Sequence, residues 1–508
     1  MSTSENNKRI AKNTIFLYIR MFLMMAIALY TSRVVLDVLG AADYGLNNVI
    51  NGVVILFSFL NNALLSATQR FLNYSIGQND LKKTNSVFCM SMNTYFILSI
   101  FVFLLGETIG LWFVNTQLNI SENRMYAAHW VYQFTLLQFS VNLLRIPYNA
   151  SIIAYERMSF YAYVSLFEGV AKLLLVYILY ITSFDKLIIY SFLYTLVPIL
   201  ITIVYKIYCN KVFTTTRYRF IWDVQIFKSL FSFSGWSLLG SLAHLSAQQG
   251  INILINIFYG VTVNAALGIA NQISANVYGF ISNFQTAFQP QIIKSYAAND
   301  HQRLNSLIFK TSKFSYYMVI VLVIPILFTM DGLLDLWLKE IPQYTSDFAR
   351  LILVFMCIEA ITAPLWMSVQ ATGKIRDYQI LMAGIVFLNF PLAFCALKMG
   401  FSPYSVFYIR IIINIISLFV RCIYMKYKMD FPFARYFVQV LIPIIRVSFF
   451  AIPIPLLAYH LLNHNIENLL FIGLLSFVIV LLDIYYGGLN GVERISLNKL
   501  IKNKLFHR

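Results

Sequence analysis

The sequence predicts an all-α membrane protein with about fourteen transmembrane helices, and three observations support this prediction. Of the 508 residues, 59% are hydrophobic and 12% are charged, whereas soluble domains carry about 25% charged residues. Apolar stretches of about 20 residues, the length that crosses a ~30 Å hydrocarbon core, recur along the whole chain. The Lys and Arg residues also alternate between loops in the pattern that orients membrane proteins.

The expected spans follow one another with short polar connections. The first apolar run is far longer than the core of a signal peptide and no small-residue cleavage site follows it, so we expect it to remain as a span. The predicted spans are 13–36, 44–69, 86–111, 125–152, 159–182, 187–208, 229–258, 264–289, 311–335, 346–371, 377–398, 403–424, 438–460 and 467–487.

The orientation follows from the distribution of basic residues. With the N-terminus in the cytoplasm, 27 of the 38 Lys and Arg residues fall in cytoplasmic segments, 5 in outer loops and 6 within spans. Because a miscounted span would blur this contrast, the ratio indicates an even number of spans and cytoplasmic N- and C-termini. The net charge of +17 then reflects topology and contact with anionic membrane lipids, so we expect no nucleic-acid partner.

An internal repeat relates the two halves of the chain. The matches run in order through both halves at a nearly constant shift, which a chance similarity would not do. At a shift of 220 residues they are Gly40 with Gly260, Asn51 with Asn271 and Gln69 with Gln289; Pro147 with Pro364, and the segment Glu107–Trp112 with Asp331–Trp337, follow at similar shifts.

The repeat predicts two six-helix bundles followed by two additional helices. Since six is even, both bundles enter the membrane from the same side, so the repeat is parallel and its pseudo-two-fold axis runs along the membrane normal. Two such bundles rocking about a central site give alternating access. The predicted domains are residues 1–210 for the N-terminal bundle, 211–228 for a cytoplasmic linker, 229–430 for the C-terminal bundle, and 431–508 for the additional helices and a basic tail.

Polar residues form stripes along several spans. In the seventh span they recur every three or four residues and therefore share one helix face. Such a face either packs against another helix or lines a hydrated cavity, because it is costly against lipid. Both alternatives remain open for the large amides that we assign as candidate substrate-binding residues. These amides are Asn51, Asn271, Gln69 and Gln289, and the seventh-span stripe is Ser237, Ser241, His244, Gln248, Asn252 and Asn256.

Charged residues inside the spans are further candidates, because a charge near the bilayer centre costs about 2.5–3.5 kcal/mol on insertion scales. Basic residues outnumber the two acidic ones, Glu168 and Glu359, and a guanidinium group binds phosphate bidentately. Glu168 precedes Lys172 by four residues, so a mutual salt bridge is an alternative interpretation of that pair. The candidates for contact with an anionic headgroup are Arg20, Arg145, Lys172 and Arg410.

The chain lacks the motifs of several enzyme classes. It has no Walker-type phosphate loop, no His-Glu-x-x-His metal motif and no Gly-x-Ser-x-Gly nucleophile motif. The five cysteines are scattered without metal-binding spacing. No outer loop is long enough to carry a catalytic site. We therefore expect neither enzymatic activity nor a cofactor or metal.

Two segments resemble the polysaccharide-transporter family, of which O-antigen flippases are members. They are residues 30–46, with the sequence YTSRVVLDVLGAADYGL, and residues 270–273, with the sequence ANQI. The family is part of the superfamily of multidrug, oligosaccharidyl-lipid and polysaccharide exporters, and the resemblance covers about the first 430 residues.

The resemblance implies a flippase in the bacterial inner membrane that translocates undecaprenyl-diphosphate-linked oligosaccharide for O-antigen lipopolysaccharide, capsule or exopolysaccharide. It implies a cationic central cavity and contact with polysaccharide polymerase machinery. Coupling to H⁺ or Na⁺ is discussed for the superfamily, and Glu168 and Glu359 are the candidate carriers here.

Three alternatives remain open. The two additional helices resemble those of fourteen-span lipid II flippases. A cation-coupled multidrug exporter of the same superfamily is a second alternative, although acidic residues would then be expected to prevail inside the spans. A membrane glycan polymerase or glycosyltransferase is the third, and the short loops argue against it.

Overall fold

The computed structural model describes residues 3–55, 58–116, 120–338, 341–463, 465–495 and 498. Every regular element in these residues is helical, which confirms the all-α prediction. The α-helices are α1 (Thr3–Ile55), α2 (Ser58–Gly77), α3 (Leu81–Leu105), α4 (Leu111–Thr116), α5 (Glu122–Ala154), α6 (Met158–Ile178), α7 (Lys186–Val212), α8 (Val224–Ala297), α9 (His301–Trp337), α10 (Thr345–Thr372), α11 (Arg376–Phe387), α12 (Asn389–Lys398), α13 (Tyr404–Met429), α14 (Phe433–Tyr436), α15 (Ile442–Ala451), α16 (Pro453–Leu461) and α17 (Ile466–Asp483).

The helices identify a multi-pass membrane protein. Within the described residues, ten helical stretches are long and apolar enough to cross a membrane. Helices α2, α5 and α8 and the part of α1 beyond Gly40 are not among the ten. Large apolar side chains cover the outside of the helices, as on α17, where Phe471 and Leu474 are 55% and 67% exposed. Such a surface suits contact with lipid rather than water.

Most residues of the predicted spans are helical, although the fifth span, predicted as 159–182, runs past the end of α6 at Ile178. Several helices are longer than their spans. Helix α9, for example, begins at His301, ten residues before the predicted span. The difference has a simple cause, because hydrophobicity marks only the part of a helix that crosses the hydrocarbon core. Residues 56 and 57 of the second predicted span lie outside the described residues.

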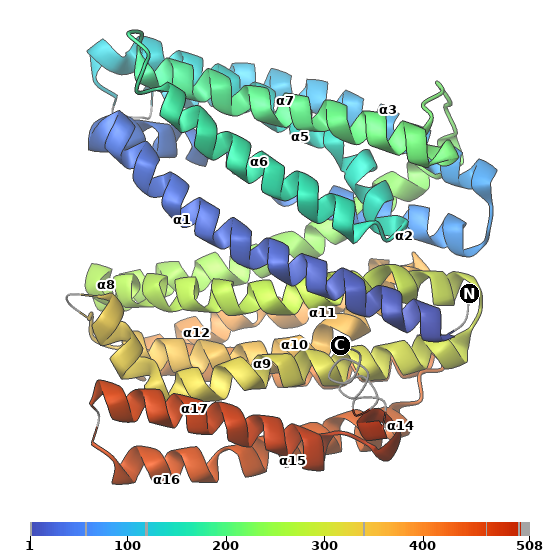
Figure 1. Ribbon diagram of the computed structural model, residues 1–508, viewed down its shortest axis with the longest axis vertical. Coiled ribbons are helices and arrows are strands. Elements are labelled where there is room, and N and C mark those ends of the chain that lie inside the picture. The colour runs from blue at the N-terminus through green and yellow to red at the C-terminus, as the bar shows by residue number, and fades with distance from the viewer. Residues whose placement is uncertain are drawn as a thin grey trace, which may run out of the picture. The chain divides into compact units, whose positions relative to one another are not determined.

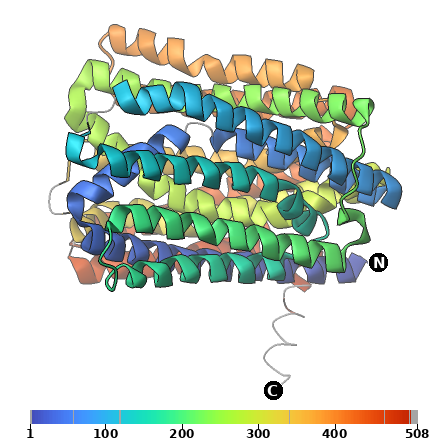
Figure 2. The same cartoon turned by 90° about the horizontal axis from the view of Figure 1, so that it is seen from above.

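The chain forms two compact units. One comprises Met1–Leu242 with Ile293–Asn299 and Gln370–Arg376, and the other comprises Ala243–Ile292, Asp300–Val369 and Asp377–Arg508. In the first unit α5 packs against α1, α2, α3, α6 and α7, and α1 also packs along α6 (Figure 1). The helices of this unit lie side by side with roughly aligned axes (Figure 2). The predicted domain boundaries at 210, 228 and 430 remain predictions.

In the second unit the C-terminal helices pack on α9. Helix α17 lies along α9, and α15 and α16 pack on α17 (Figure 1). A Cβ atom on Gly332 would lie 2.2 Å from Leu469, so the small residue permits the close approach of α9 and α17. An ion pair of 2.6 Å between Lys313 and Glu493 and a hydrogen bond of 3.0 Å from Tyr317 to the Gly488 carbonyl secure the end of this contact.

Two glycines interrupt long helices at repeat-equivalent positions. Gly40 in α1 has φ 75° and ψ 166°, and Gly260 in α8 has φ 81° and ψ −175°. This region of backbone space is accessible essentially only to glycine. Each long helix is therefore two helices joined at a glycine, which explains how the first and second spans, and the seventh and eighth, connect without a loop.

The turn after the second span of each repeat has the same local design. Asn79 and Asn299 both have φ 57°. The next residue, Asp80 or Asp300, caps the following helix by accepting a hydrogen bond from the backbone three residues later, of 2.9 Å and 3.0 Å respectively.

A polar pair also recurs between the third and fourth spans of each repeat. Gln133 donates to Glu107 over 3.0 Å, and at the equivalent positions Arg350 donates to Asp331 over 2.7 Å. The internal repeat is therefore present in local geometry as well as in sequence.

We predict that Gly260→Ala lowers the free energy of unfolding by about 1–3 kcal/mol, because alanine is strained at this φ. Thermal unfolding of the purified protein measures the effect. Gly268→Ala is the matched control, since Gly268 lies in the same helix, no atom lies within 4 Å of the position that an added methyl group would take, and alanine favours a helix there. Equal unfolding temperatures for the two variants would contradict the prediction.

Candidate functional site

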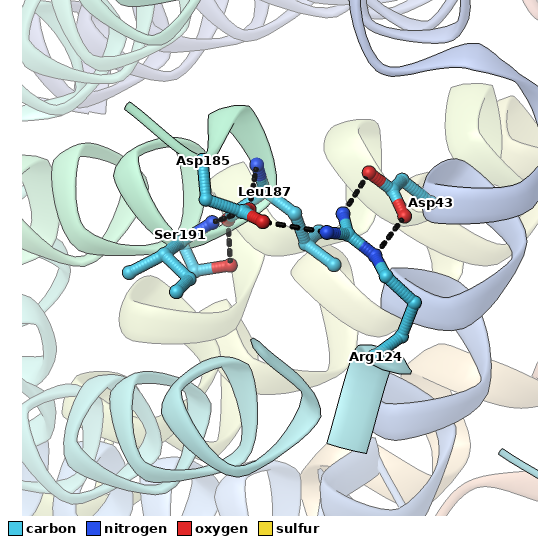
Figure 3. Close-up of polar contacts among 6 residues, drawn as sticks. Asp43, Arg124, Asp185, Leu187 and Ser191 are labelled. Atoms are coloured by element: carbon cyan, nitrogen blue, oxygen red, sulfur yellow. Dashed lines mark hydrogen bonds and ion pairs between the residues drawn. The ribbon is translucent and has the colours of Figure 1, made fainter. Parts of the chain in front are cut away.

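A half-buried arginine cluster fixes three helices at one end of the first unit (Figure 3). Arg124 of α5 lies between two carboxylates, Asp43 of α1 and Asp185 before α7. Its Nε donates to Asp43 over 2.9 Å and its Nη1 donates to Asp185 over 2.5 Å. Asp185 also caps α7 by accepting from the backbone of Leu187 over 3.0 Å. The cluster therefore sets the spacing of the helices that form the walls of a cavity.

This cavity, which we call the first-unit cavity, has a volume of about 530 Å³. Pockets for small molecules range from about 300 to 1,000 Å³, so it is large enough for a ligand. Amide, hydroxyl, aromatic and aliphatic side chains form its walls. The lining residues are Met24, Ile27, Ala28, Thr31, Val35, Tyr44, Asn47, Asn51, Thr135, Gln138, Phe139, Asn142, Gly169, Lys172, Tyr190, Ser191, Tyr194 and Thr195.

The polar wall is partly satisfied by internal hydrogen bonds. Asn51 accepts from the Thr135 hydroxyl over 3.1 Å and donates to the side chain of Asn47 over 3.0 Å. The side-chain oxygen of Asn142 is buried and has no hydrogen-bond partner in the described part of the chain. A buried unpaired acceptor is costly, so a ligand hydroxyl or a water that donates to Asn142 would be favoured.

A three-residue charge network lies beside this cavity. Glu168 bridges two cations, with 2.9 Å from its carboxylate to Lys172 and 2.9 Å to Arg145. The anticipated Glu168–Lys172 salt bridge is therefore present, and Arg145 joins it. Lys172 lines the cavity and lies 4.7 Å from the ring centre of Tyr194. The network carries one net positive charge and presents it at the cavity wall.

The second unit contains a smaller cavity, of about 30 Å³, which we call the second-unit cavity. It includes the predicted site residues Arg410 and Glu359. Arg410 lies over the ring of Phe355, with 4.1 Å from its guanidinium carbon to the ring centre. The lining residues are His244, Ala247, Gln248, Ile251, Phe355, Glu359, Val386, Asn389, Arg410, Ile413, Asn414, Ser417 and Arg421.

The remaining predicted site residues lie away from both linings in the described structure. Arg20 of α1 donates to Ser165 over 3.1 Å and lies over the ring of Tyr161. Gln69 and Gln289 are buried, at 4% and 9% exposure. The backbone carbonyl of Asn271 accepts from the Ser274 hydroxyl over 2.9 Å. The structure thus brings Asn51, Lys172, Arg145 and Glu168 together in the first unit, and Arg410 and Glu359 in the second.

Sequence reasoning missed two polar stripes that line these cavities. On α5 they are Thr135, Gln138 and Asn142. On α13 the missed residues are Asn414, Ser417 and Arg421, which share a face with the predicted Arg410. Arg421 was assigned to a cytoplasmic segment, but it is 8% exposed and lines the second-unit cavity. The signal was available, because steps of three and four residues place each set on one helix face.

The two cavities are lined by repeat-equivalent positions. At a shift of 220 residues, the α1 lining positions 24, 27, 28 and 31 become the α8 lining positions 244, 247, 248 and 251. At a shift of 217 residues, Asn142 corresponds to Glu359 and Lys172 to Asn389. The positions are shared, but their charges differ.

Metal binding is not indicated by the side chains. In the part of the chain that the structure describes, no three His, Cys, Asp or Glu residues lie close enough to hold a metal ion.

The fold is that of the multidrug and toxic compound extrusion (MATE) transporters. An outward-facing multidrug resistance MATE family transporter of the MOP superfamily superposes with a TM-score of 0.73 at 15% identity, covering 84% of this chain and 96% of that chain. MATE in the straight conformation gives a TM-score of 0.73, 15% identity and the same coverage.

A third similar structure is a MOP superfamily transporter from Pyrococcus furiosus, described as having a binding pocket of reversed polarity. It gives a TM-score of 0.69 at 13% identity, covering 84% of this chain and 96% of that chain. No family model and no curated protein matches the sequence. At these identities the comparisons establish the fold, and the resemblance to the polysaccharide-transporter branch remains a prediction.

We predict that Glu168→Gln destabilises the first unit by about 1–3 kcal/mol, because it leaves Arg145 and Lys172 half-buried without a counter-charge. Thermal unfolding of the purified protein measures the loss. Asp331→Asn is the control, since that carboxylate is 51% exposed and its pairing should contribute less than about 1 kcal/mol. A larger loss for the control would contradict the importance assigned to the network.

Proposed function

We propose that the protein is a flippase that translocates an undecaprenyl-diphosphate-linked oligosaccharide by alternating access, without covalent chemistry. The observation that carries the proposal is the excess of basic over acidic residues inside the spans, combined with a large cavity of amide, hydroxyl and aromatic groups. The expected setting is a bacterial inner membrane with cytoplasmic termini, anionic lipids as neighbours and polysaccharide polymerase machinery as a partner.

The first-unit cavity suits a sugar. Sugar rings present hydroxyl groups at their edges, which pair with amides such as Asn51, Gln138 and Asn142. Their apolar faces pack on aromatic rings such as Tyr190 and Tyr194. A cavity of about 530 Å³ admits part of a glycan, while the lipid tail remains in the surrounding bilayer.

The charge balance suits an anionic lipid headgroup. Lys172 and Arg145 together exceed the one carboxylate, Glu168, that pairs with them. A diphosphate would add negative charge where the protein has a positive surplus. The Pyrococcus furiosus transporter supports this step by analogy, since its binding pocket is described as reversed in polarity within the same fold.

Contacts between the two sequence repeats support an alternating cycle. Lys294 of α8 forms an ion pair of 2.8 Å with Glu156, whose side chain is 0% exposed. Arg70 donates to the Ala371 carbonyl over 3.2 Å. The charge pattern assigns these segments to the cytoplasmic side. A transporter that opens to the cytoplasm must break such contacts, so they would act as the closed gate of the cycle.

A multidrug exporter is the second candidate, because the similar solved structures include a multidrug resistance MATE transporter. The charge of the cavities separates the two functions. An exporter of organic cations needs an excess of carboxylates at its site, whereas Glu168 here is paired with two cations and Glu359 shares its cavity with two arginines.

Deletion of the gene tests the proposal directly. We expect loss of a surface glycan and accumulation of its lipid-linked precursor on the cytoplasmic face, because the polymerising steps lie on the other side of the membrane. Surface-glycan blotting and extraction of lipid-linked sugars measure the two quantities. Normal glycan display, or hypersensitivity to cationic drugs with normal display, would reject the flippase and favour an exporter.

Complementation with cavity variants tests the site. Gln138→Leu and Asn51→Leu should each reduce glycan export about tenfold or more, since each removes an amide proposed to hydrogen-bond the sugar, and a polar group left unpaired in a buried site costs about 1–3 kcal/mol. Lys398→Gln is the control, because Lys398 is exposed and lies outside both linings. Protein abundance is measured in parallel, and full export by both leucine variants would remove the cavity from the mechanism.

A further inference from the structure

The second-unit cavity has donor groups without partners. Arg421 is 8% exposed, and its Nε has no hydrogen-bond partner in the described structure. Its Nη1 makes only a long contact of 3.5 Å with the Thr362 carbonyl. Asn414, two turns away on the same helix face, is 6% exposed, and its side-chain NH₂ is also without a partner among the described residues. Both residues line the cavity.

The charges around the cavity do not balance. Arg410 and Arg421 carry two positive charges, and Glu359 carries the one negative charge on the lining. None of the ion pairs in the described part of the chain joins Glu359 to either arginine. His244 also faces the cavity and adds no negative charge. A buried cation without a partner is costly, so the site favours a bound anion.

The cavity is small. Its volume is about 30 Å³, and about 10–15 Å³ measured in this way is the least that holds one water molecule. The space therefore suits a small inorganic anion, such as chloride, rather than a lipid with its attached glycan.

We propose that the second-unit cavity binds a small inorganic anion, for which chloride is the probe, held by Nε of Arg421, the side-chain NH₂ of Asn414 and the charge of Arg410. The site is separate from the first-unit cavity proposed for the glycan, and none of its lining residues is shared with that cavity. Bound chloride neutralises the surplus charge and holds α13 to α10 and α8, so its occupancy couples the ionic medium to the packing of the second unit.

Binding of ³⁶Cl⁻ to the purified full-length protein tests the proposal. We expect saturable binding that bromide displaces and gluconate does not, because gluconate is too large for the cavity. Arg421→Gln should weaken binding at least tenfold. Arg446→Gln should bind as the unmodified protein does, since Arg446 is exposed and lies outside the lining.

Asn414→Asp provides a second test of anion binding, because it keeps the side-chain shape and places a negative charge against the anion. It should abolish binding while the protein elutes as a single monodisperse peak, and it decides the question if Arg421→Gln fails to fold. Absence of saturable binding, or unchanged binding in Asn414→Asp, would overturn the proposal. An unfolding temperature of the protein that rises with sodium at constant chloride would also overturn the proposal, since that outcome assigns the cavity to a cation at Glu359. None of these measurements depends on glycan export, so their result is independent of the flippase proposal.

Discussion

The arrangement of this protein depends on one constraint: a polar or charged group inside a lipid-embedded helix must find its partner within the protein. Glu168 shows how the constraint is met, since its two carboxylate oxygens serve two cations on two helices. Arg124 meets it in the opposite sense, with one guanidinium group held between two carboxylates (Figure 3). Such clusters fix helix spacing in a medium where apolar packing alone does not distinguish a helix from a lipid tail. The cavities lie where this pairing is incomplete.

The two cavities illustrate how a duplicated architecture diverges. Equivalent positions line both, so the duplication supplied a hollow beside the first, fourth, fifth and sixth helices of each repeat. The first-unit cavity has kept neutral amides and aromatic rings around Lys172 and is large enough for a sugar. The second-unit cavity contains two arginines and is much smaller. One fold thus provides two cavities that differ in size and in charge.

The same fold occurs in transporters whose binding pockets differ in polarity. The similar structures include a multidrug resistance transporter and a transporter described as having reversed pocket polarity, and they resemble this chain about equally well in backbone. Function in this architecture is therefore decided by the side chains inside the cavities rather than by the helices that surround them. For this chain, the polar side chains on the two linings are neutral or basic, with Glu359 as the one carboxylate among them.

The amino-acid sequence by itself determined the helical class, the spans, the internal repeat and the positions that interrupt the helices. Each of these depends on local properties: the length of an apolar run, the periodicity of polar residues, and the backbone freedom that glycine alone has at positions 40 and 260. Only the tertiary structure decided which charges meet. Arg145 and Glu168 are 23 residues apart, and Arg124 and Asp43 are 81 apart, so no spacing rule predicts either pair. Arg421 was expected in a cytoplasmic segment, but the tertiary structure places it on the wall of the second-unit cavity, where it is buried. A stripe shows which residues share a helix face, but what that face meets depends on packing between helices that are distant in the sequence.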